Sequence, residues 1–221
     1  MLYFLLVLVV GIIVFVGVKL KKHKSLYPFM PFRYDFRKRR DTFRRALELL
    51  EKSQAKLLIE TGTSRLGLKG SKSNGAATIV FGKWAKLNGA KLHSVDINPE
   101  SVRVAKSAVA NQSLSAYTEI HTSDSVDYLQ KFNDQVDFLY LDSYDYSLDP
   151  EVQKASQEHH LKEFQAIENQ LHTNIIVMID DCDLPGGGKG KTVIAYMLNR
   201  GWTVDKSAYQ VILLKKENTI F

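Results

Sequence analysis

The chain has few of the residues that cross-link or interrupt a fold. Cys182 is the one cysteine among 221 residues, which excludes an internal disulfide framework and is compatible with a reducing compartment. The sequence has no internal repeat and no low-complexity tract. With 45% apolar and 24% charged residues, it can bury one sizeable core. One soluble domain is therefore expected beside any membrane segment.

The sequence has a single long apolar run. Residues 2–18, LYFLLVLVVGIIVFVGV, contain no charge and, at about 1.5 Å per residue, nearly match a hydrocarbon core of about 30 Å. No basic residue precedes the run and no small-x-small cleavage site follows it, which favours an anchor over a signal peptide. Because lysines follow at once, the body of the protein is expected to face the cytoplasm. These features predict a single-pass membrane anchor over residues 1–18.

The net charge of +6 is unevenly distributed. Residues 1–45 hold 11 Lys/Arg and two Asp, or +9, whereas the remainder holds 19 basic and 22 acidic residues, or −3. This distribution argues against nucleic acid as a partner and favours a basic collar on anionic membrane lipid, although a purely solvated topology signal stays open. Residues 19–40 mix prolines, aromatic and basic residues, which suits an interfacial linker. The domain proper is expected over residues 41–221, with Asp41 capping a first covering helix.

Short apolar runs alternate with helical patterns from residue 56 onward. The expected strands cover residues 56–61, 91–97, 116–123, 136–142 and 174–181. The expected helices cover residues 76–87, 100–110, 126–132, 151–171 and 192–199. Such alternation predicts an α/β fold with a mainly parallel sheet covered on both faces. The last two runs, 202–208 and 209–216, leave no room for a helix between them and predict a C-terminal antiparallel hairpin.

In open α/β sheets the ligand lies beyond the carboxyl ends of the strands, so the residues after each apolar run are informative. The first run ends in the turn Glu60, Thr61, Gly62, Thr63 and Ser64. Gly62 would let the backbone approach a ligand closely, and Glu60 could hold a cationic or hydroxyl group. The second ends in Asp96, suited to a ribose diol, beside Ile97, suited to an adenine ring. Ser123, Asp124 and Ser125 follow the third and could meet the adenine edge. A simple turn at the glycine and a helix cap at Asp96 stay open.

The strand order, the acidic-x-Gly turn, the acid closing the second strand and the terminal hairpin resemble the class I S-adenosylmethionine-dependent methyltransferases, over about residues 56–216. The resemblance implies S-adenosylmethionine as cofactor, with residues 60–64 around its methionine portion. It implies Asp96 and Ile97 at the ribose and adenine, and Asp124 with Ser125 at the border of the adenine. The chain departs from the family at Ser64, where a second glycine is common, and in the long stretch 65–76 that follows.

Three carboxylates follow two adjacent predicted strands: Asp142, Asp180 and Asp181. Like charges held close together need a cation, and oxygen-only ligation suits a hard ion, Mg²⁺ first. The pattern resembles metal-dependent O-methyltransferases of the catechol and macrolide-sugar types. There the ion binds two substrate oxygens and lowers the pKa of the hydroxyl to be methylated. Helix capping or exposure to water is the alternative role for these acids.

The general base is not assigned by this resemblance. Asp145 stands roughly where catechol-type enzymes have a lysine, so His159 and His160 on the next helix are the catalytic candidates, with an exposed polar helix face as the alternative. The run 184–192, LPGGGKGKT, is not a phosphate loop, because Pro185 stands where the motif needs glycine. It is expected to be a loop over the substrate pocket, with Lys189 or Lys191 able to meet an anionic group, or else a solvated turn.

The sequence thus predicts a membrane-anchored O-methyltransferase for a small-molecule, sugar or lipid-linked hydroxyl. One rival is a membrane-tethered module that keeps the cofactor fold without turnover. The other is a nicotinamide-dependent oxidoreductase, which needs a second glycine pair in the first turn that this chain lacks.

Overall fold

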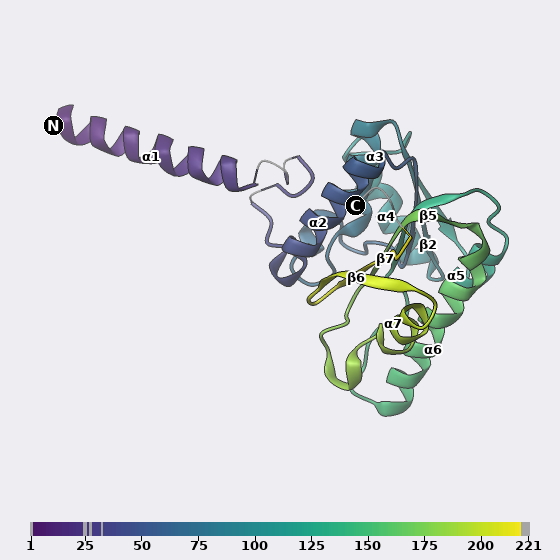
Figure 1. The fold of residues 1–221 in the computed structure, drawn as a ribbon. Helices are drawn as coiled ribbons and strands as arrows, with labels where there is room; N and C mark the ends of the chain where they lie inside the picture. The colour runs from purple at the N-terminus through teal and green to yellow at the C-terminus, as the bar shows by residue number, and fades with distance from the viewer. Residues whose placement is uncertain (1, 24–25, 27, 32, 218–221) are drawn as a thin grey trace.

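The structure is a computed structural model that describes residues 2–23, 26, 28–31 and 33–217. Helix α1 (Leu2–His23) lies apart from the sheet and the other helices (Figure 1), and the side chains of residues 3–17 are exposed. Within the described residues, no helix is both long enough and apolar enough to cross a membrane. That finding leaves the transmembrane anchor expected over residues 1–18 unconfirmed.

A seven-stranded sheet forms the centre of the domain, in the order β3-β2-β1-β4-β5-β7-β6. The strands are β1 (Leu57–Thr61), β2 (Lys91–Asp96), β3 (Thr118–Thr122), β4 (Val136–Leu141), β5 (Leu171–Ile179), β6 (Trp202–Ser207) and β7 (Val211–Lys215). The first five pair in parallel, whereas β7 is antiparallel to both β5 and β6. The α/β class, the mainly parallel sheet and the terminal hairpin are therefore confirmed.

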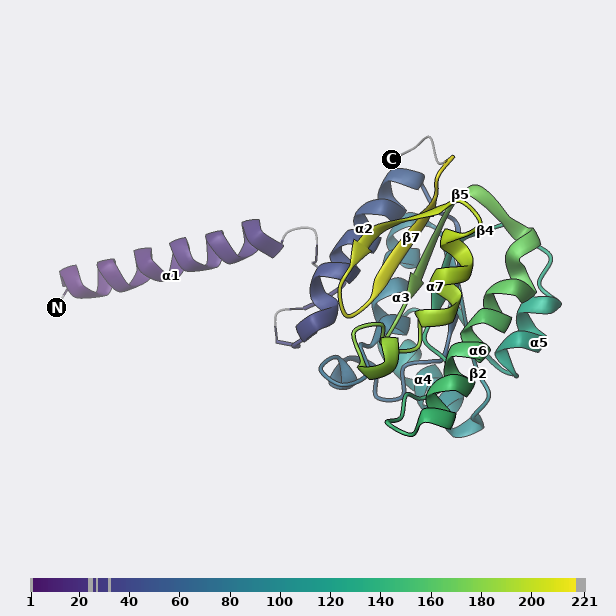
Figure 2. The same cartoon turned by 60° about the horizontal axis from the view of Figure 1, so that its bottom comes forward.

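Helices cover both faces of this sheet, as the alternating pattern predicts. One apolar core packs α2 (Arg40–Ser53), α3 (Ala77–Asn88) and α4 (Pro99–Asn111) against the sheet. A second core packs α5 (Ser125–Gln130), α6 (Pro150–Ile167) and α7 (Lys191–Leu198) against the other face. Figure 2 shows α2 and α6 on opposite sides of the strands. The central strands are buried on both faces, which is why they read as nearly continuous apolar runs.

The segment before α2 packs against the domain. Leu26, Met30 and Phe36 are buried in the same core as α2 and α3, and the ring of Phe36 contacts Phe43 edge to face at 6.2 Å. The prediction of an interfacial linker is wrong for these three side chains. Apolar side chains of this kind suit a headgroup region and a protein core equally, and here an open face of the first core receives them.

Helix α2 begins at Arg40, and Asp41 does not cap it. The capping position belongs to Arg39, which makes no side-chain capping bond, and Asp41 lies inside the first turn. A short 3-10 helix, Arg37–Arg39, leads directly into α2. The Arg39 side chain reaches Asp180, the residue that follows β5.

Candidate functional site

The carboxyl ends of four parallel strands form one rim. Backbone hydrogen bonds continue the ladder past the strand ends, from Gly62 N to Val95 O at 2.8 Å and from Asp142 N to Thr61 O at 3.0 Å. Asp180 N likewise donates to Leu141 O at 3.0 Å. The residues after β1, β4 and β5 are therefore held side by side, as parallel pairing requires.

A cleft of about 420 Å³ opens at this rim. A volume of that size is within the range of small-molecule and cofactor sites. Among the residues predicted to bind cofactor or metal, those that line it are Gly62, Asp96, Ile97, Asp124, Ser125 and Asp142. The structure thus brings together residues that come after four different strands.

Asp96 is held by backbone amides and keeps further acceptor capacity. Its Oδ2 accepts from Thr63 N at 3.1 Å and its Oδ1 from Asn98 N at 2.8 Å. Asn98 is the residue that caps α4, through its bonds from the next two backbone amides. Because each carboxylate oxygen has two lone pairs, Asp96 can still accept hydrogen bonds from a ligand in the cleft.

Asp124 and Ser125 stand at the start of α5. Asp124 Oδ1 caps the helix by accepting from Val126 N at 2.9 Å and Asp127 N at 3.1 Å. Ser125 Oγ lies 3.0 Å from His159 Nε2, and all three of Asp124, Ser125 and His159 line the cleft.

Glu60 lies away from the cleft, contrary to the expected contact with the methionine portion of a cofactor. Side chains alternate along β1, and this alternation places Glu60 on the α3 face, where Ser94 Oγ donates to its Oε2 at 2.6 Å. Burial is the main cause that raises the pKa of Glu60, to about 8, against the hydrogen bonds from Ser94 and Thr78. Thr61, Thr63 and Ser64 are also buried, and the Ser64 amide donates to Thr78 Oγ1 at 2.8 Å.

Gly62 is required for a close backbone approach. Its φ of +78° is a conformation that favours glycine, and a Cβ there would clash with the Asp142 carbonyl oxygen. The glycine therefore allows the ends of β1 and β4 to lie against each other. This contact fixes where Asp142 enters the cleft.

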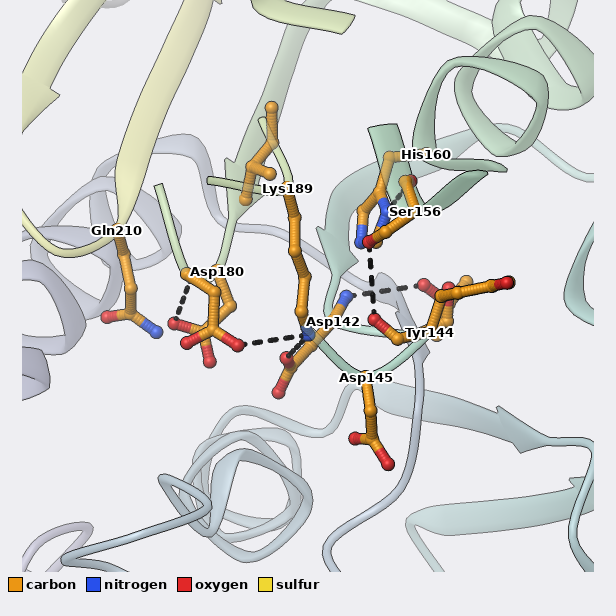
Figure 3. Close-up of polar contacts among 12 residues, drawn as sticks. Asp142, Tyr144, Asp145, Ser156, His160, Asp180, Lys189 and Gln210 are labelled. Carbon is orange, nitrogen blue, oxygen red and sulfur yellow. Dashed lines mark hydrogen bonds and ion pairs between the residues drawn. The ribbon is translucent and has the colours of Figure 1, made fainter. Parts of the chain in front are cut away.

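The three predicted metal-ligand carboxylates do converge. One oxygen from each of Asp142, Asp180 and Asp181 lies within 4.8 Å of the others. Lys189, which is 3% exposed, points to this cluster (Figure 3). Its Nζ lies 3.1 Å from Asp142 Oδ1 and 3.1 Å from Asp181 Oδ2, so an ammonium bridges two of the three carboxylates.

A second cation, Arg39, reaches the same cluster from the segment before α2. Its Nε donates to Asp180 Oδ2 at 2.8 Å and its terminal Nη2 to Asp181 Oδ1 at 3.1 Å. Asp180 is fully buried, so an unpaired charge there would be costly. Sequence reasoning missed Arg39. The available signal was charge balance, since three converging carboxylates need cations, but nothing in the sequence places the basic stretch 37–40 beside them.

The charges in this cluster shift one another in opposite directions. Burial raises the pKa of Asp142 well above its usual range, and the charge of Asp180 adds to that effect against the opposing Lys189. Burial alone would lower the pKa of Lys189, but the carboxylates outweigh it and raise the pKa. The pKa of Asp181 is lowered, because Lys189, Tyr209 and Arg39 outweigh burial. Lys189 is therefore held as an ammonium.

Further polar groups brace the cluster on the side of β4 and β7. Gln210 Nε2 donates to the Tyr140 hydroxyl at 2.8 Å, and Thr42 Oγ1 donates to Gln210 Oε1. The Tyr140 hydroxyl donates to Asp142 Oδ2 at 3.5 Å. Gln210 and Tyr140 were not predicted, because each lies inside an apolar strand-like run and nothing local marks it as part of a site.

The two candidate histidines differ in position. His159 lines the cleft, and its Nε2 lies 3.3 Å from Glu163 Oε1. Burial would lower the pKa of His159, but its hydrogen bond and ion pair with Glu163 outweigh burial and raise it. His160 is fully buried, its Nδ1 donates to Ser156 O at 2.8 Å, and burial lowers its pKa to about 4. Only His159 is therefore placed to meet a ligand in the cleft.

The glycine-rich run 184–192 is tied down and carries Lys189 inward. Gln157 Nε2 donates to Gly186 O at 3.2 Å and to Gly188 O at 2.9 Å. Lys189 meets carboxylates of its own chain, whereas Lys191 is exposed. Asp145, at the predicted position of a family lysine, forms an exposed two-point ion pair with Arg65.

A seven-stranded sheet in this order, with a cleft at its parallel strand ends, is the architecture of the class I methyltransferases that the sequence resembles. The comparison with families agrees. A profile described as a methyltransferase domain matches residues 72–182, which is 111 of 221 residues. The chain belongs to this family and is an S-adenosylmethionine-dependent methyltransferase.

Solved structures with the same fold include O-methyltransferases. A putative caffeoyl-CoA O-methyltransferase from Staphylococcus aureus has 15% identity and a TM-score of 0.59, with 90% of this chain and 91% of that chain covered. The O-methyltransferase from Bacillus cereus in complex with SAH has 13% identity and a TM-score of 0.55, with 87% and 88% covered. No curated protein matches the sequence. At these identities, the structural likeness concerns the fold.

Proposed function

We propose that this methyltransferase transfers the methyl group of S-adenosylmethionine to a hydroxyl oxygen of a small-molecule, sugar or lipid-linked acceptor. One observation carries the proposal: Asp142 both lines the cleft and belongs to the carboxylate cluster. An acceptor oxygen bound at the cluster would therefore lie next to a cofactor bound in the cleft. Holding the oxygen in line with the sulfonium methyl is the main source of rate in such a transfer.

Within the cleft, each predicted cofactor contact has a proposed partner. Asp96 would accept from the two ribose hydroxyls, and Ile97, which is exposed, would cover the adenine ring. Asp124 and Ser125 would meet the adenine edge, with His159 behind Ser125. The backbone at Gly62 would pass beside the methionine portion. Glu60 would support this wall through Ser94 without touching the cofactor.

The carboxylate cluster fits a hard divalent cation in donor type and number, since three oxygens from three side chains lie within 4.8 Å of one another. Asp142, Asp180 and Asp181 would hold Mg²⁺, which when bound would lower the pKa of the acceptor hydroxyl. Lys189 already contacts two of these carboxylates, so a metal ion must compete with its ammonium. Arg39 would continue to orient Asp180 and Asp181.

We also propose that helix α1 holds the enzyme at a membrane, with its basic flank on the cytoplasmic side. Exposed apolar side chains over residues 3–16 and the following lysines support this proposal. The test compares the full chain with an Ile13→Arg variant by sedimentation with anionic vesicles. Equal sedimentation of the two would count against the tether.

The function is tested with the full chain and methyl-labelled S-adenosylmethionine, using panels of catechol, sugar and lipid-linked hydroxyl acceptors. We expect label transfer to one panel, and its loss in Asp142→Asn with retained binding of S-adenosylhomocysteine in calorimetry. Binding without transfer to any panel would favour the non-catalytic module. Binding of NAD in place of S-adenosylhomocysteine would favour the oxidoreductase.

A further inference from the structure

A second group of ligand-type side chains lies on β2 and β3, outside the cleft. His93 is opposite Glu119 in the parallel register, and His121 is opposite Val95, so His93, Glu119 and His121 share one face of the sheet. This is the face that α5 covers, and β3 is the edge strand. The three side chains are 17%, 49% and 33% exposed, so the group is open to solvent at the sheet edge.

The spacing of the donor atoms matches a tetrahedral metal ion. His93 Nδ1 and His121 Nε2 lie 3.3 Å apart. Zinc–nitrogen bonds of about 2.0–2.1 Å at a tetrahedral angle place two ligand nitrogens about 3.3–3.4 Å apart. Glu119 Oε2 lies 3.9 Å from His93 Nδ1 and 4.0 Å from His121 Nε2. Because Glu119 is half exposed, a small rotation of its side chain can close that gap.

The hydrogen-bonding capacity of His93 points the same way. Its Nδ1 is approached by His121 Nε2, by the Tyr128 hydroxyl at 3.0 Å and by Glu119 Oε2. A ring nitrogen has either one proton or one lone pair, so it can satisfy only one of these three neighbours well. A cation placed among the three side chains would let each of them direct a lone pair at the same point.

Aromatic neighbours restrict the orientation of the two imidazoles. Their rings stack at a centroid distance of 5.5 Å with planes 8° apart. Phe132 packs edge to face on His93 at 5.4 Å, and Tyr128 packs on His121 at 4.9 Å. Fixed ligand orientation of this kind raises metal affinity. Lys91 pairs with the other oxygen of Glu119, Oε1, at 3.4 Å, which leaves Oε2 facing the histidines.

We propose that His93, Glu119 and His121 bind a zinc-class transition-metal ion that joins the edge strand β3 to β2. Two imidazole nitrogens and one carboxylate oxygen select such an ion, whereas the oxygen-only cluster at Asp142 selects a harder one. Water or the Tyr128 hydroxyl completes the coordination. The ion stabilises the outer part of the sheet, which includes β2, the strand that ends in Asp96 at the cleft.

The test is a calorimetric titration of the metal-free full chain with Zn²⁺ in the presence of excess Mg²⁺. We expect one strong site with a Kd of about micromolar or tighter, weakened at least about tenfold in His93→Gln and His121→Gln. Glu119→Gln is an exposed substitution that spares the packing, and it should also weaken binding. His172→Gln is the matched control, because His172 contacts Asp137 at 2.9 Å and the Asn174 amide at 3.1 Å and none of the three proposed ligands, so it should leave zinc binding unchanged.

Absence of a strong zinc site in the wild type would overturn the proposal. The proposal would also be overturned if Glu119→Gln and a folded His93→Gln, His121→Gln double variant both bound zinc as tightly as the wild type does. Asp180→Asn separates this site from the proposed active site. It should keep zinc affinity while losing any response to Mg²⁺, so either site can fail without the other.

Discussion

Replacing Lys189 with methionine tests whether the carboxylate cluster depends on an internal cation. Asp142 would lose its one described ion-pair partner, whereas Asp181 would keep Arg39 at 3.1 Å. Removing one partner of a buried ion pair costs about 3–5 kcal/mol, because the remaining charge is left uncompensated. We therefore expect the free energy of unfolding of Lys189→Met to fall by about that amount in EDTA.

The loss should depend on pH with a definite sign. The pKa of Asp142 is already raised above its unfolded value. Without Lys189 the pKa of Asp142 would rise further. The folded variant is therefore stabilised when Asp142 is protonated, and it loses that stability as the pH increases above the pKa that Asp142 has in the unfolded chain. The deficit relative to wild type should be larger at about pH 8 than at about pH 5.

Urea unfolding of the full chain at both pH values measures these effects. Lys191→Met, two positions along the same loop and exposed, is the matched control and should lie within about 0.5 kcal/mol of wild type. If Lys189→Met behaves like that control, the assignment of Lys189 as the cluster's cation is refuted. A second measurement adds excess Mg²⁺. If the carboxylate cluster binds the metal ion, Mg²⁺ should stabilise Lys189→Met more than wild type, because the Lys189 ammonium no longer competes for the carboxylates. Stabilisation of neither protein would refute the metal proposal alone.

Three further changes test other parts of the structure. Glu163→Gln should lower the pKa of His159, so the stability difference from wild type, measured by denaturant unfolding, should be larger at about pH 5.5 than at about pH 8.5. A histidine whose pKa is raised by folding stabilises the protein at pH values below its pKa in the unfolded chain. That stabilisation is lost as the pH rises above its pKa in the folded protein. Gly62→Ala should weaken S-adenosylhomocysteine binding at least about tenfold in calorimetry, because its Cβ meets the Asp142 carbonyl; unchanged affinity would show that the strand ends can separate freely. Phe36→Ala should cost about 3–5 kcal/mol in urea unfolding, whereas a linker residue would cost almost nothing.

The fold could be predicted because each βα unit carries its own local signals. Apolar runs of strand length alternate with helical periodicity, and parallel pairing then brings residues such as Asp96 and Asp142 to the same rim. Glu60 shows the limit of that reasoning. Its position in sequence puts it near the rim, but the alternation of side chains along β1 directs it under α3. A shift of one residue in the strand would have placed its side chain on the opposite face of the sheet.

The carboxylate cluster shows a different limit. Three acids at neighbouring strand ends predict that a cation must be present, because like charges at such distances cannot remain unpaired. They do not predict which cation, since a metal ion, an ammonium and a guanidinium satisfy the same requirement. The answer depends on residues 39 and 189, which are 150 positions apart in sequence and reach the cluster only through tertiary packing. The packing of Leu26, Met30 and Phe36 on the first core brings Arg39 to Asp180, so the segment next to helix α1 also contributes to the charge balance of the site.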